Sequence, residues 1–85
     1  MGSKKILREQ FLEIVDNQIK SNNPPETNQT LKRLKEMGYS DKDARLLIGQ
    51  CVVVEIFDVL KHRKPFDEKR YIKNLMNLPK EPFGE

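Results

Sequence analysis

Apolar residues recur at intervals of three and four along most of the chain, which is the spacing of an amphipathic helix. In the first segment these residues are Leu7, Phe11, Ile14 and Ile19, with charged side chains between them. Similar segments follow, separated by stretches that contain proline, glycine or asparagine. The pattern predicts an all-α chain of four helices, over residues 4–20, 24–37, 41–61 and 68–78.

Residues typical of helix ends lie between the first three segments. Asn23 precedes two prolines, which cannot continue a helix but suit the first turn of the next one, so we expect Asn23 to cap the second helix. Gly38 suits the left-handed residue that follows a helix. Ser40 and Asp43 have the spacing of a capping box, with Asp in place of the usual Glu. The third helix is therefore expected to begin directly after Ser40.

The fourth segment has its own start signal. Pro65 stops the third helix, and Asp67 is a favourable cap for the next one. Phe66, before that cap, and Tyr71, four residues after it, have the spacing of a hydrophobic staple. We expect these two rings to pack on each other.

The third predicted helix is apolar on more than one face, so it must be covered on several sides. Glu55 interrupts its apolar run, and a partly buried carboxylate needs a basic partner, for which we expect Arg8 or Arg33. The pattern predicts a compact four-helix domain with a central, largely buried third helix. The other three helices, or a second copy of the chain in a homodimer, would supply the cover.

The 85 residues allow one domain, which we place over residues 1–79, followed by an irregular tail over 80–85. Hydrophobic residues make up 36% of the chain, and no apolar run approaches the roughly 18 residues of a membrane helix. The first residues lack the apolar core of a secretory signal. We therefore expect a cytoplasmic protein that does not span a membrane. Cys51, the single cysteine, is expected to be a small buried hydrophobe.

No segment carries a catalytic, cofactor or glycine-rich phosphate-binding signature. Glu55, Asp58 and His62 share one side of the third helix, but such a trio is more often ordinary surface chemistry than a metal site. We expect a non-enzymatic protein with no catalytic or metal-binding residues, no cofactor and no small-molecule substrate.

Basic residues gather between positions 61 and 73. Six cations face two carboxylates there, a local net charge of +4 against +3 for the whole chain. Such a cluster beside an aromatic residue suits a nucleic-acid backbone, although it also suits a solvated face with cations at a helix end. The candidate nucleic-acid contacts are Lys61, Arg63, Lys64, Lys69, Arg70 and Lys73.

Met37, Gly38 and Tyr39, with Ala44 shortly after, resemble the first loop of the ubiquitin-associated (UBA) domain. That resemblance covers about 20 residues and implies ubiquitin binding through the Met-Gly-Tyr loop. It ends where the third predicted helix runs on without the break that the family has. Other recognisable elements are Asn23-Pro24-Pro25-Glu26-Thr27, Glu55-Ile56, Pro65-Phe66 and Leu78-Pro79. Through these elements the chain resembles, over most of residues 6–79, a family of short, uncharacterised bacterial helical proteins, which implies a compact all-α fold and no particular activity.

These observations favour a small protein-interaction module, self-associating or binding another protein. We expect its contact surface to include the apolar excess of the third helix and aromatic side chains near the fourth. The candidate interface residues are Val53, Phe57, Phe66 and Tyr71. The alternative is a nucleic-acid-binding accessory protein that uses the basic segment 61–73.

Overall fold

The computed structural model describes residues 3–80, and the side chains of residues 9–80. It contains four helices: α1 (Ser3–Ser21), α2 (Pro25–Glu36), α3 (Asp41–His62) and α4 (Glu68–Asn77). No strand occurs among the described residues. The all-α prediction is confirmed, and each predicted helix bound lies within one residue of the observed one. Apart from Lys80, the predicted irregular tail lies outside the described residues.

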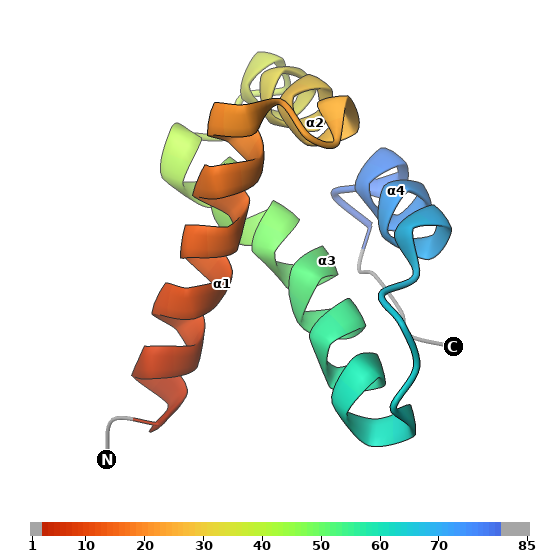
Figure 1. The fold of residues 1–85 in the computed structure, drawn as a ribbon. Coiled ribbons are helices and arrows are strands. Elements are labelled where there is room, and N and C mark those ends of the chain that lie inside the picture. The colour runs from red at the N-terminus through yellow and green to blue at the C-terminus, as the bar shows by residue number, and fades with distance from the viewer. Residues whose placement is uncertain (1–2, 81–85) are drawn as a thin grey trace.

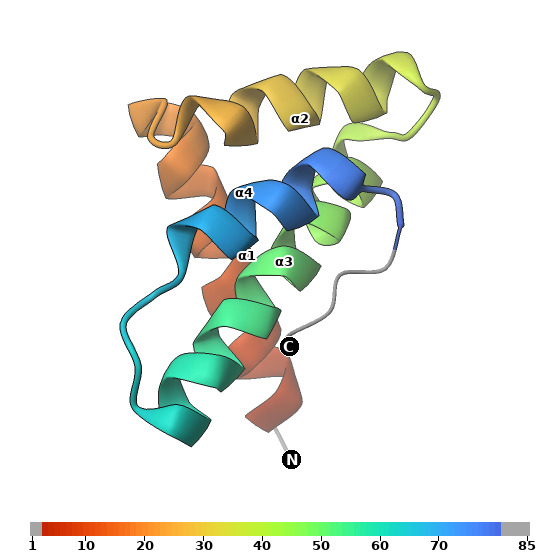
Figure 2. The same ribbon diagram turned by 90° about the vertical axis from the view of Figure 1, so that its right-hand side faces the viewer.

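The third helix is the longest and packs against each of the other three (Figures 1 and 2). α1 and α3 run in opposite directions and diverge toward the start of α1 and the end of α3 (Figure 1). α2 lies across the end where they meet, and α4 packs against both α2 and α3. The last turns of α3 consequently extend away from α2 and α4.

All four helices contribute side chains to the core. The fully buried apolar residues include Val15, Leu34, Ile48 and Leu75, from α1, α2, α3 and α4 in turn. The second half of α3 is less well covered, because several of its apolar side chains are half-buried or exposed. The central position predicted for this helix is confirmed, while its burial is greatest over the first four turns.

One buried polar contact joins three helices. The side-chain oxygen of Gln18 on α1 accepts hydrogen bonds from Thr27 Oγ1 on α2 (2.8 Å) and from the Tyr71 hydroxyl on α4 (2.6 Å). Thr27 and Tyr71 are fully buried. Burial is also the main reason why the pKa of Tyr71 is raised to about 12. Both hydroxyl groups donate to an acceptor, so neither is a buried donor without a hydrogen bond, which would be unfavourable.

The predicted caps of the third and fourth helices are present. Ser40 Oγ accepts from the backbone N–H of Asp43 (3.0 Å), and Asp67 Oδ1 accepts from that of Arg70 (3.1 Å). Gly38 has a φ of +109°, a conformation that a side chain would strain. These contacts fix where α3 and α4 begin.

The expected cap of the second helix is wrong. Pro25 takes the first helical position, which places Pro24 and not Asn23 in the cap position. A proline side chain has no acceptor, and α2 begins without a side-chain cap hydrogen bond. The pair of prolines marks the start of the helix correctly, but it displaces the cap by one residue.

A matched pair of leucines tests the location of the core. Leu34→Ala should lower the free energy of unfolding by about 2–5 kcal/mol, because Leu34 is fully buried and its removal leaves a cavity. Leu60→Ala, at a side chain that is 70% exposed, should cost less than about 0.5 kcal/mol. Urea unfolding followed by circular dichroism measures both changes, and equal losses would contradict this packing.

Candidate protein-interaction surface

The carboxylate of Glu55 is fully buried between α3 and α4 and is paired with Arg70. Arg70 Nε lies 2.7 Å from Glu55 Oε2, and Arg70 Nη2 lies 3.0 Å from Glu55 Oε1. The backbone N–H of Asp67 also donates to Glu55 Oε1 (3.3 Å). This bidentate geometry is the strongest form of an arginine–carboxylate pair, and it attaches the start of α4 to the middle of α3.

The predicted need of Glu55 for a basic partner is confirmed, but the observed partner is Arg70 and not Arg33. Arg33 donates instead to the carbonyl oxygens of Leu78 (2.8 Å) and Leu75 (2.9 Å), at the far end of α4. A cation at that position adds a donor to carbonyl groups at the end of the helix, where the helix dipole favours positive charge. The side chain of Arg8 lies outside the described part of the chain. The two arginines that hold α4 are therefore Arg33 at its end and Arg70 in its first turn.

Asp58 and His62 extend the charged contact along α3. Asp58 Oδ2 lies 2.9 Å from Arg70 Nη2, and Asp58 Oδ1 lies 2.9 Å from His62 Nδ1. Hydrogen bonds from His62 and from Arg70 lower the pKa of Asp58. The hydrogen bonds that Arg70 donates to Glu55 and Asp58 raise the pKa of Arg70, which stays charged. Both carboxylates are therefore paired with the Arg70 guanidinium.

The opposite face of α3 carries exposed apolar side chains. Residues two apart on a helix point in nearly opposite directions, roughly 160° apart at 3.6 residues per turn. Val53 and Phe57 each lie two residues from Glu55, and Leu60 lies within one turn of Phe57 on the same side. Phe57 is 55% exposed, Leu60 is 70% exposed and Val53 is half-buried. We call Val53, Phe57 and Leu60 the α3 stripe.

The structure separates the candidate interface residues. Val53 and Phe57 lie together on the α3 stripe, whereas Phe66 is 43% exposed in the segment before α4. Tyr71 is fully buried, so the prediction that it lies on a contact surface is wrong. Its ring packs edge-on against Phe66, with centroids 5.5 Å apart, as the hydrophobic staple predicted. That contact, together with the hydroxyl bond to Gln18, draws Tyr71 into the core.

Leu60 is not among the predicted interface residues, although it is the most exposed large hydrophobic residue of α3. It follows Val53 by seven residues and Phe57 by three, which places all three side chains on one helix face. That spacing was the available signal. The spacing was not distinctive within the longer apolar run, because that run does not indicate which face of the helix α1 and α4 leave uncovered.

The basic residues of segment 61–73 fall into two groups. Arg70 is used by Glu55 and Asp58, as described above. The other candidate contacts are exposed, and none forms an ion pair with another residue in the part of the chain described by the structure. These residues are Lys61, Arg63, Lys64, Lys69 and Lys73.

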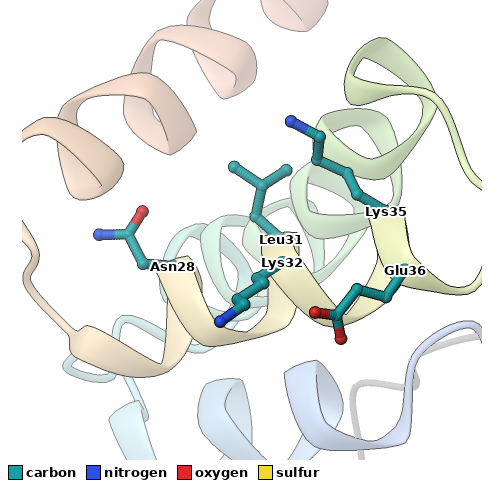
Figure 3. Close-up of a pocket in the computed structure, with 5 residues that line it drawn as sticks. All are labelled: Asn28, Leu31, Lys32, Lys35 and Glu36. Atoms are coloured by element: carbon teal, nitrogen blue, oxygen red, sulfur yellow. The ribbon is translucent and has the colours of Figure 1, made fainter.

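A hollow beside α2 offers no chemistry of its own (Figure 3). It is lined by Asn28, Leu31, Lys32, Lys35 and Glu36. The Asn28 side-chain amide already donates to the Ile19 carbonyl oxygen (3.1 Å), and Lys35 lies 3.5 Å from Asp41 in an ion pair. Because these polar groups are engaged in the fold or extend into solvent, the hollow favours no reaction.

Cys51 is fully buried, as predicted, and burial raises the pKa of its thiol to about 12. Among the residues that the structure describes, no group of three His, Cys, Asp or Glu side chains is arranged to hold a metal ion. None of the described helices combines the length and apolar character required to cross a membrane.

The chain matches no protein-family model, no curated protein and no solved structure in the three comparisons made. Of the residues that resemble a UBA loop, Met37 is exposed, Tyr39 is half-buried and Gly38 lies at the turn between α2 and α3. Ubiquitin binding and membership of the short bacterial helical family stay predictions.

Removing the cation from the buried pair should destabilise the fold strongly. Arg70→Met should cost about 3–5 kcal/mol of unfolding free energy, because it leaves the Glu55 carboxylate buried without its partner. Replacing both residues, as Glu55→Leu with Arg70→Met, should cost less than Arg70→Met alone. Urea titration of the two variants makes this comparison.

Arg45→Met is the matched control for that experiment. Arg45 pairs with Asp16 and Asp41, whose side chains are about half exposed. Its loss should therefore cost no more than about 1 kcal/mol. A loss at Arg70 as small as the loss at Arg45 would show that Glu55 is not held in a buried pair.

The thiol of Cys51 should be unreactive in the folded protein. A pKa of about 12 keeps it protonated at pH 8, where only the thiolate attacks a disulfide reagent, and the core covers the sulfur. Ellman's reagent should release no dye from the native chain over minutes, and one equivalent after unfolding in guanidinium chloride. Rapid stoichiometric release from the native protein would contradict the burial.

Proposed function

We propose that this chain is a small, non-enzymatic protein-interaction module of the cytoplasm, and that the α3 stripe is its contact surface. The observation that supports the proposal is the exposure of Phe57 and Leu60 on one helix face. A small domain has few apolar residues to spare, because its surface is large for its volume. Two large apolar side chains that the core does not use, on adjacent turns, are typical of a recognition site.

The energetics of association support the same surface. Burying a Phe or Leu side chain fully is worth roughly 1.5–3 kcal/mol, so Phe57 and Leu60 together would supply a useful share of the binding free energy. Interfaces commonly depend on a few such central anchors, surrounded by contacts of little net energy. Val53, half-buried beside them, would extend the apolar centre.

The second candidate function is binding of a nucleic-acid backbone by segment 61–73. The observation in its favour is the set of five exposed cations described above. Two facts reduce the attraction of this segment for phosphate groups. Asp67 and Glu68 are also exposed there, and Arg70 is engaged within the fold. It predicts binding that weakens steeply as salt concentration rises.

Capture on beads from a lysate of the source organism tests the proposal, with and without nuclease. The immobilised wild-type chain should retain a protein in stoichiometric amount, another protein or the chain itself, and nuclease should not release it. Phe57→Ser combined with Leu60→Ser should reduce this retention at least tenfold, since it removes both anchors. Quantitative mass spectrometry of the bound fraction gives the measurement.

Met76→Ser is the matched control, because Met76 is 68% exposed on α4, away from the α3 stripe. It should leave retention unchanged. Equal retention by the double variant would exclude the α3 stripe as the contact surface. Loss of all bound material on nuclease treatment would favour the nucleic-acid function instead.

A further inference from the structure

We infer that the partner segment that covers the α3 stripe is an acidic amphipathic helix. This inference rests on the proposed function and adds the chemistry of the partner. It combines two features at the end of α3: apolar side chains at helical spacing, and a group of cations directly after them.

The apolar part of the site is narrow and straight. Val53, Phe57 and Leu60 follow one another by four and three residues, so they form a row about two turns long, near 10 Å. A partner helix laid along this row would meet it with apolar side chains spaced in the same way. The last turns of α3 extend away from α2 and α4 (Figures 1 and 2), and Phe57 and Leu60 on these turns are exposed.

Three cations that are not in ion pairs border this row. Lys61 follows Phe57 by four residues on the same helix, and Arg63 and Lys64 come directly after the helix ends at His62. All three cations are exposed and form no ion pair with the described residues. Asp67 and Glu68 are exposed a few residues further along the chain, but neither forms an ion pair with these three cations, so carboxylates on a partner could pair with them.

The acids of α3 in this region are unable to neutralise those cations. Glu55 is buried on the opposite side of the helix, and Asp58 is bound to Arg70 and His62. A second copy that offered its own α3 stripe would bring apolar side chains together with the same cations. Charge complementarity therefore favours an acidic partner over a second copy.

Two synthetic helical peptides of about 18 residues test the inference. Both carry leucines at three- and four-residue spacing, and they differ only in having glutamates or lysines beside the leucines. Fluorescence anisotropy should show the acidic peptide binding at least tenfold more tightly than the basic one. The double variant with Lys61→Glu and Lys64→Glu should reverse this order.

The matched control carries Lys32→Glu and Lys73→Glu, at exposed lysines of α2 and α4, and should keep the wild-type order. Phe57→Ser should weaken binding of the acidic peptide at least tenfold. The inference is overturned if the charge reversal leaves the preference for the acidic peptide intact, or if neither peptide binds.

The outcomes separate this inference from the proposed function. Equal binding of the two peptides that is lost in Phe57→Ser would retain the α3 stripe as a contact surface and reject an acidic partner. Concentration-dependent dimers in sedimentation velocity that are lost in Phe57→Ser, without peptide binding, would assign the stripe to a second copy. If Phe57→Ser left binding of the acidic peptide unchanged, the binding would depend on charge attraction alone. That result would count against both the inferred acidic helix and the α3 stripe as a contact surface.

Discussion

The buried carboxylate of Glu55 is the constraint on which the arrangement of this protein depends. A charge in the core is tolerated only when a close opposite charge and further hydrogen bonds replace its hydration. Arg70 and the backbone N–H of Asp67 meet that need, and both lie at the start of α4. The ion pair therefore decides against which side of α3 the last helix packs. Arg33 then holds the opposite end of α4 through its carbonyl groups.

The position of α4 explains why an apolar surface remains exposed. Residues two positions from Glu55 face the other way on a helix, so a helix attached at Glu55 cannot cover Val53 or Phe57. α1 also diverges from α3 toward the same end (Figure 1). The charged contact that stabilises the fold thus also leaves the α3 stripe uncovered.

Much of this fold was predictable, because helix ends are decided by local chemistry. Ser40, Asp67 and Gly38 act through neighbours within a few residues, so their pattern located the helices to within one residue. Pairings between distant segments were not predictable. Arg70 reaches Glu55 only because of the path taken by residues 63–67, and Tyr71 is buried with its hydroxyl on Gln18, 53 residues away. Which face of α3 stays exposed depends on those pairings, so the stripe was only partly predicted.

The most direct test of the account is methyl-group NMR with a soluble paramagnetic agent, on the free protein and on its complex with the protein that it retains. In the free protein, the methyl signals of Leu60 should relax strongly and those of Leu34 should not, given their exposure of 70% and 0%. Binding should protect Leu60 and Val53 and leave exposed Met76 unchanged. Protection of Leu60 in the free monomer, or its continued exposure in the complex, would contradict the account.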